Sequence, residues 1–129
     1  MQAMILEIEL RAQSEDWTSR RFETIYFGGG TPSVLTSDQT SRITSALHSS
    51  LNLLENLKEA TIEVNPEDVT SESLDAWLRC GFDRISIGVQ SFQDSQLLWM
   101  NRKHTSEEAV KAVELAHTVG FSKISVDLI

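Results

Sequence analysis

The chain has 129 residues, and 19 acidic residues against 11 lysines and arginines give it a net charge of −8 at pH 7. This length is typical of one domain with a real hydrophobic core. The negative charge argues against nucleic acid as a partner, because binding to phosphates needs positive charge. No apolar run is long enough for a membrane span and no signal sequence opens the chain, so the sequence predicts a soluble cytoplasmic protein.

Helical and strand patterns alternate along the chain. In chain order we expect a helix over 1–12, a strand over 24–27, a helix over 36–54, a strand over 61–65, a helix around 74–78, a strand over 84–89, a short helix around 97–100, a helix over 105–116 and a strand over 123–129. Two helix starts carry a capping pattern, Thr36 with Gln39 and Thr105 with Glu108. The alternation predicts a parallel sheet built by right-handed crossovers.

The two faces of the expected strands differ in polarity. One face is apolar and suits packing under helices: Ile25, Phe27, Ile62, Val64, Ile85, Ile87, Val89, Ile124, Val126 and Leu128. The other is polar or small: Tyr26, Gly28, Thr61, Glu63, Asn65, Ser86, Gly88, Gln90, Ser125 and Asp127. A doubly wound sheet would be apolar on both faces. The pattern therefore favours a partial (β/α) barrel of about four parallel strands with outer helices, and an open sheet with one wet face is the alternative.

The chain begins within a helical pattern that has no cap and stops within a strand pattern, whereas natural domain ends usually fall in polar tails. Four strands cannot close a barrel, so two edges would lack a partner. We therefore expect residues 1–129 to be the central part of a partial barrel in a longer protein. We also expect the isolated segment to associate through its exposed sheet edges.

Polar or backbone-exposing residues occur at the carboxyl end of every expected strand. They are Gly28 to Thr31 after the first, Glu63 and Asn65 on the second, Gln90 and Ser91 on the third, and Asp127 on the fourth. Ligands of (β/α) folds bind at this end of the sheet. Glycines let a backbone approach a ligand closely. The glycine run lacks P-loop and GxGxxG spacing, however, and a plain tight turn is the alternative.

Glu63 is the strongest single candidate, because an inward-facing acid needs a partner such as an amine, a ribose hydroxyl or an arginine. The alternative is a structural ion pair, with Arg102 as one candidate partner. The same alternative applies to Gln90 and Asp127.

The remaining reactive residues predict no metal site or nucleophile. The three histidines lack metal-ligand spacing and are expected at the surface: His48, His104 and His117. The only cysteine, Cys80, excludes an internal disulfide. It precedes Gly81 at a helix end, which predicts a buried, inert thiol.

Five motifs occur in a fixed order: FGGGTPS, IEVNPED, RISIGVQSFQD, MNRKHT and SVDLI. Together they resemble the radical S-adenosylmethionine (radical SAM) proteins of the oxygen-independent coproporphyrinogen III oxidase group, over residues 24–129. RISIGVQSF and MNRKH resemble the heme chaperone branch, HemW, more than the true oxidases, which usually have Asp where this chain has Ser91.

This resemblance implies that S-adenosylmethionine binds at the strand ends. The glycine loop would offer backbone and hydroxyl groups to the ammonium and carboxylate region of the cofactor, and a heme or porphyrin would be the partner of the longer protein. The positions that match the cofactor contacts of the family are Gly29, Gly30, Thr31, Glu63, Gln90, Arg102 and Asp127.

The family holds a [4Fe-4S] cluster on a C-x3-C-x2-C loop that these residues lack, so the resemblance implies no radical chemistry by this chain alone. We therefore assign no catalytic or metal-binding residue. Three functions stay open: part of a HemW-like heme chaperone, part of an oxidase that decarboxylates coproporphyrinogen III to protoporphyrinogen, or a non-catalytic remnant or binding module.

Overall fold

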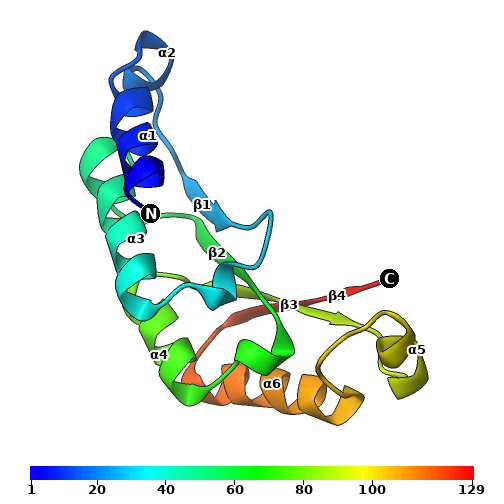
Figure 1. The fold of residues 1–129 in the computed structure, drawn as a ribbon. Coiled ribbons are helices and arrows are strands. Elements are labelled where there is room, and N and C mark those ends of the chain that lie inside the picture. Colours follow the sequence, from blue (N-terminus) through cyan, green and yellow to red (C-terminus); the bar gives the residue numbers. More distant parts are fainter.

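The computed structural model describes residues 1–129 and contains one four-stranded parallel sheet with its main helices on one face (Figure 1). The strands lie side by side in chain order: β1 (Thr24–Phe27), β2 (Glu59–Val64), β3 (Arg84–Gln90) and β4 (Lys123–Leu128). The helices are α1 (Gln2–Ala12), α2 (Glu15–Thr18), α3 (Ser37–Ser50), α4 (Ser71–Arg79), α5 (Asp94–Trp99) and α6 (Ser106–Val119). This arrangement confirms the predicted partial (β/α) barrel with outer helices.

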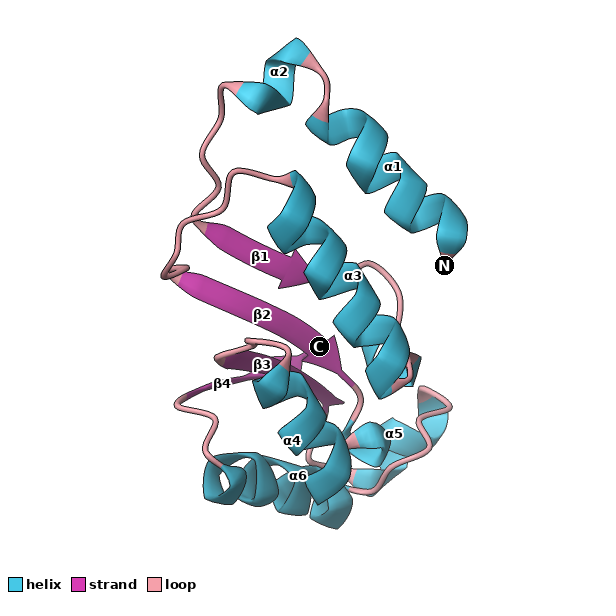
Figure 2. Cartoon of the chain, turned by 90° about the vertical axis from the view of Figure 1, so that its left-hand side faces the viewer, coloured by secondary structure: helices cyan, strands magenta, loops and turns pink.

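The helices cover the apolar face of the sheet in sequence order. In Figure 2, α3 lies in front of the first two strands, α4 and α6 follow beside it, and α1 packs on α3. Short 3₁₀ helices, η1 (Pro32–Val34) and η2 (Pro66–Asp68), follow β1 and β2. None of the helices is both long and apolar enough to cross a membrane.

The predicted helix caps are confirmed, and one helix end was predicted wrongly. Thr36 and Thr105 both form capping boxes, each of which stabilises its helix by about 1 kcal/mol. Helix α3 ends at Ser50, short of the predicted residue 54, because the backbone turns extended at Leu51. Leu53 then forms an isolated parallel bridge with Phe22. The leucines after α3 thus keep helical spacing in sequence although they do not lie on a helix.

The core lies between the apolar strand face and the helices. Ile62, Ile85 and Ile87 from the central strands are completely buried against Trp77 of α4 and Ala116 of α6. At 25 cal/mol per Å², side chains of this size each contribute about 1.5–3 kcal/mol when fully buried. The helical layer therefore fixes which strand face is apolar, and the alternate side chains must point to the other side.

The polar strand face is aligned by the parallel register. Glu63 lies beside Ser86, and Ser86 lies beside Ser125. One step toward the strand starts, Tyr26 lies beside Thr61. The register thus arranges the polar side chains in rows that run across the sheet. Polar residues near the strand carboxyl ends, such as Glu63 and Ser86, therefore lie side by side.

The exposed β4 edge predicts self-association, because an unpaired strand edge offers free backbone donors and acceptors to another chain. We expect the 129-residue chain to form oligomers in light scattering, and Val126→Lys on β4 to shift it toward the monomer. Val110→Lys on α6 is the matched control, since Val110 is a similarly exposed valine on a helix. A wild-type chain that scatters as a sharp monomer would contradict this prediction.

Candidate functional site

A polar pocket of about 220 Å³ lies at the carboxyl ends of the strands. It is lined by Gly30, Thr31, Pro32, Glu63, Val64, Asn65, Ser86, Gly88, Gln90, Arg102 and Asp127. Six of the seven predicted cofactor residues are in this list. The seventh, Gly29, lines an adjoining pocket of about 350 Å³ between the glycine loop, α1 and α3. The structure therefore brings together residues that are spread along the sequence from Gly29 to Asp127.

The glycine loop is shaped by contact with the protein's own carboxylate. Gly29 has a φ of +83°, a left-handed conformation that favours glycine. Its N–H donates a hydrogen bond of 3.3 Å to Oε2 of Glu63. A β-carbon at Gly28 would lie 2.6 Å from Cε1 of Tyr26 and 2.9 Å from Cδ of Glu63. A larger residue at 28 would thus displace the Tyr26 and Glu63 side chains, and glycine at 29 suits the left-handed backbone.

Glu63 is half-buried and has only neutral donors around it. Besides the Gly29 amide, the Tyr26 hydroxyl donates to its Oε1 at 2.5 Å. None of the ion pairs in the structure includes Glu63 or Asp127, so the alternative of a structural ion pair with Arg102 is not what the fold contains. A partly buried carboxylate without a cation favours a positively charged or hydroxyl-bearing ligand.

The Glu63 carboxylate changes the acidity of the Tyr26 hydroxyl. Its hydrogen bond to Glu63, together with partial desolvation and the negative charges of Glu63 and Asp127, raises the pKa of Tyr26 to about 12. Deprotonation is disfavoured for two reasons: the phenolate could no longer donate to Glu63, and its negative charge would lie beside the Glu63 carboxylate. Tyr26 therefore stays a hydrogen-bond donor to Glu63 throughout the physiological pH range.

Arg102 supplies the opposite charge. Its Nη2 donates to Oδ1 of Asn65 at 2.8 Å and to the Gly88 carbonyl at 3.1 Å, while its buried Nε has no partner. A guanidinium has five N–H donors, and neutral acceptors do not balance its charge. The Nη1 atom of Arg102 forms no hydrogen bond within the protein and is not among the buried unpaired atoms, so Arg102 offers Nη1 donors and a positive charge to an anionic group.

Gln90 lies at an irregular place in the sheet. The β3–β4 register shifts between Ile87 and Gln90, and Gln90 has a φ of +66°, which is uncommon for a residue other than glycine. Such conformations cost about 1–3 kcal/mol and cluster at functional sites. Gly88 makes room here, because a β-carbon on it would lie 3.0 Å from Nε2 of Gln90.

Asp127 is held by hydrogen bonds from two serines on the polar strand face, Ser86 directly and Ser125 through Ser86. The Ser86 hydroxyl lies 3.0 and 3.1 Å from the two carboxylate oxygens, and the Ser125 hydroxyl lies 3.1 Å from that of Ser86. Asp127 itself is exposed at the pocket. The small hydroxyls thus fix the carboxylate while leaving its outer side open to a ligand.

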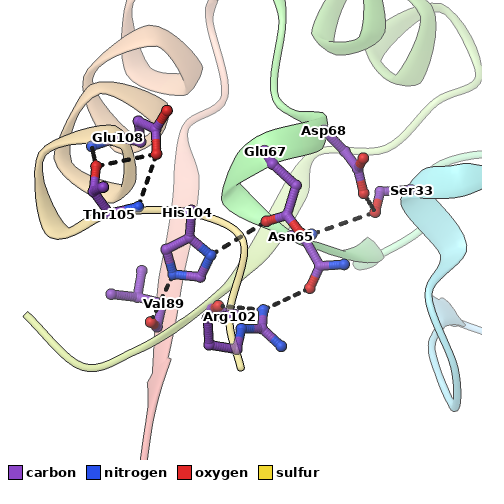
Figure 3. Close-up of polar contacts among 10 residues, drawn as sticks. Ser33, Asn65, Glu67, Asp68, Val89, Arg102, His104, Thr105 and Glu108 are labelled. Atoms are coloured by element: carbon purple, nitrogen blue, oxygen red, sulfur yellow. Dashed lines mark hydrogen bonds and ion pairs between the residues drawn. The ribbon is translucent and has the colours of Figure 1, made fainter. Parts of the chain in front are cut away.

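The prediction for His104 was wrong: this residue is buried rather than at the surface, with 3% of its area exposed. Figure 3 shows its two ring nitrogens facing the Val89 carbonyl at 3.0 Å and Oε2 of Glu67 at 3.2 Å. No periodicity marks this position, because His104 lies in the loop between α5 and α6. The short motif MNRKHT, with Arg102 two residues earlier, was the only available signal.

The sequence also did not predict the hydrogen bonds that connect the loop after β1 with the loop after β2. The Ser33 hydroxyl donates to Oδ2 of Asp68 at 2.5 Å, and the backbone N–H of Asn65 donates to Oγ of Ser33 at 3.3 Å (Figure 3). Ser33 lies in the 3₁₀ helix that follows the glycine loop. The loop after β1 is therefore anchored to the loop after β2, which carries Asn65.

Cys80 lies away from this pocket. It caps the end of α4, which precedes the start of β3, and it is half-buried rather than buried as predicted. The structure contains no group of three or more His, Cys, Asp or Glu side chains that could hold a metal ion.

The four parallel strands, the glycine loop and the charged strand ends place this chain in the (β/α) class of folds, whose ligand sites lie at the strand carboxyl ends. Residues 5–129 match the model of the radical SAM superfamily, and the chain belongs to this family. It is 40% identical over 109 residues to the heme chaperone HemW of Lactococcus lactis, a match that covers 84% of this chain and 28% of that protein.

Two further similarities concern porphyrin oxidases. The chain is 36% identical over 108 residues to the oxygen-independent coproporphyrinogen III oxidase of Pseudomonas aeruginosa, covering 83% of this chain and 24% of that protein. The solved structure of the coproporphyrinogen III oxidase HemN of Escherichia coli superimposes with a TM-score of 0.86 at 30% identity, over 98% of this chain and 29% of that one. The matches thus span 24% to 29% of the length of these relatives.

The Tyr26–Glu63 hydrogen bond can be tested directly, because Tyr26 is the only tyrosine in the chain. We expect phenolate absorption, recorded after a rapid pH jump, to show a midpoint near pH 12 in the wild type. Glu63→Gln removes the negative charge and should return the midpoint toward the ordinary value of about 10. Glu9→Gln on α1 is the control, and equal midpoints in all three proteins would contradict the bond.

Proposed function

We propose that this chain is the S-adenosylmethionine-binding portion of a radical SAM protein of heme metabolism, similar to the HemW heme chaperones. The observation that carries the proposal is the pair of opposite charges that share one pocket without neutralising each other. Glu63 contacts two neutral donors, and Arg102 contacts two neutral acceptors.

This pair of charges suits the amino-acid end of S-adenosylmethionine, which carries both an ammonium and a carboxylate group. Glu63 would bind the ammonium, and the unpartnered Nη1 of Arg102 would donate to the carboxylate. Gly29, Gly30 and Thr31 would provide backbone and hydroxyl groups at the same end. Gln90 and Asp127 would bind the remaining polar groups of the cofactor. In this family the bound cofactor supplies a 5′-deoxyadenosyl radical when it is reduced.

The [4Fe-4S] cluster of the family does not fit the residues present. Three thiolates are needed, and the single cysteine, Cys80, lies at the opposite end of the sheet. The proposal therefore limits this chain to binding and orienting S-adenosylmethionine. Cluster binding, reduction, and contact with heme or a porphyrin would belong to a longer parent protein.

The heme chaperone role is favoured over the oxidase role by Ser91 and by the 40% identity to the HemW of Lactococcus lactis, against 36% to the oxidase of Pseudomonas aeruginosa, although identities to the two groups otherwise overlap. The Ser91 hydroxyl donates to Oε1 of Gln96 at 2.5 Å and accepts from the backbone N–H of Gln93 at 3.1 Å. These bonds connect the loop after β3 to α5. Coproporphyrinogen III oxidase is the second candidate function, supported by the HemN superposition. Protoporphyrinogen formation by the parent protein would favour the oxidase, and heme transfer without turnover would favour the chaperone.

Cofactor binding can be tested with the chain itself. We expect saturation-transfer NMR to detect binding of S-adenosylmethionine, and adenosine, which lacks the amino-acid end, to bind more weakly. Glu63→Gln should weaken S-adenosylmethionine binding by about tenfold, the effect of losing one charge-assisted hydrogen bond.

The control for this experiment is again Glu9→Gln, an exposed acid on α1 outside the pocket, which should bind like the wild type. Absence of saturation transfer to S-adenosylmethionine would contradict the proposed function. Equal affinity for adenosine and S-adenosylmethionine would contradict the role given to Glu63 and Arg102, and binding would then have to depend on the nucleoside end alone. In that case the chain would be a binding module for a different ligand.

A further inference from the structure

His104 forms a buried link between the loops that carry the pocket residues. Its side chain is fully inaccessible to solvent, and each ring nitrogen faces an oxygen acceptor from a different element. Nε2 lies 3.0 Å from the Val89 carbonyl at the end of β3, and Nδ1 lies 3.2 Å from Oε2 of Glu67 in η2. The ring therefore joins three segments: the carboxyl end of β3, the loop after β2, and the loop between α5 and α6.

Each point of this link is one or two residues from a pocket residue. Val89 immediately precedes Gln90, Glu67 follows Asn65 by two positions, and His104 follows Arg102 by two positions. In Figure 3 the His104 ring and the Arg102 guanidinium come from the same loop and both reach toward the ends of β2 and β3. A shift of the ring would therefore move all three pocket residues together.

The loop that carries Arg102 is anchored at several points, and His104 provides one of them. At its start, the Arg102 N–H donates to the Leu97 carbonyl at 2.9 Å, and Asn101 has a φ of +54°. At its far end, Thr105 begins α6 with a capping box. Between these points, the two ring nitrogens of His104 contact two other elements, Glu67 in η2 and the Val89 carbonyl in β3.

The polar surroundings of the ring indicate a positioning role rather than simple filling of the core. A buried apolar side chain could fill the same space, but it could not bind Glu67 and the Val89 carbonyl. The Val89 carbonyl can only accept, so its contact is a hydrogen bond when Nε2 carries a proton. The contact with Glu67 is a hydrogen bond when a proton lies on either Nδ1 or the carboxyl oxygen. The charged groups around the ring are Glu67 from η2, Glu108 from α6 and Arg102 from its own loop.

We propose that His104, clamped between Glu67 and the Val89 carbonyl, is a positioning residue that holds Arg102 and Gln90 at the cofactor pocket. The inference rests on the proposed function only for the identity of the ligand. The clamp itself makes a claim about the free protein: without the His104 ring, the loop that carries Arg102 loses one anchor, and the guanidinium is held less firmly by its own hydrogen bonds to Asn65 and the Gly88 carbonyl.

The first experiment measures Arg102 in the free chain by NMR. Its buried Nε–H should exchange slowly with solvent in the wild type. His104→Ala should increase the exchange rate by about tenfold or more, because the loop then loses one of its anchors. His104→Gln, whose amide can still donate to the Val89 carbonyl, should restore part of the protection.

Phe121→Leu is the matched control. Phe121 is equally buried but lies before the start of β4, at the opposite end of the sheet from the pocket. It should lower the melting temperature without changing exchange at Arg102. Unchanged exchange in His104→Ala, fast exchange in the wild type, or equal loss of protection in Phe121→Leu would each overturn the positioning role.

The second experiment measures the affinity of the same variants for S-adenosylmethionine. We expect His104→Ala to bind about tenfold more weakly, His104→Gln to lie between it and the wild type, and Phe121→Leu to bind normally. If the wild type does not bind S-adenosylmethionine while Arg102 exchange still depends on His104, the proposed function fails and the clamp stands. If the wild type binds and His104→Ala binds equally well with unchanged exchange, the clamp fails and the proposed function stands.

Discussion

The parallel register of the four strands is the constraint on which the rest of the structure depends. Helices cover one face of the sheet, and their packing requires Ile62, Ile85 and Ile87 to point toward them. Because side chains alternate along a strand, Glu63 and Ser86 must point to the opposite face, where the register places them side by side. The carboxyl ends of parallel strands meet at one edge, so the strand ends and the loops that follow them form a ligand pocket there.

Within this pocket, the fold keeps two charges apart that would neutralise each other if they met. Tyr26 and the Gly29 amide hold Glu63 on the side of β1, while Asn65 and the Gly88 carbonyl hold Arg102 on the side of β3. Neutral hydrogen bonds fix both groups and leave their charges available. The geometry is thereby organised before a ligand arrives, which lowers the cost of binding a zwitterion.

The sequence predicted the fold well because its signals were local and repeated. Alternating polarity identified the strands, and Thr36 and Thr105 marked two helix starts that the structure confirms. The pocket residues were found because they follow strands or match family motifs. What the sequence did not indicate depends on long-range contacts: Tyr26 meets Glu63 across 37 positions, and His104 is buried by elements that come before it in the chain. No periodicity within one segment encodes such contacts.

The central claim is that S-adenosylmethionine binds the polar strand face, and the most direct test maps the backbone amides of the chain with and without the cofactor. The account predicts chemical-shift changes at Gly29, Gly30, Thr31 and Gln90, with little change on the outer faces of α3 and α6. Changes that are confined to the helical face, or that are spread evenly over the chain, would contradict it.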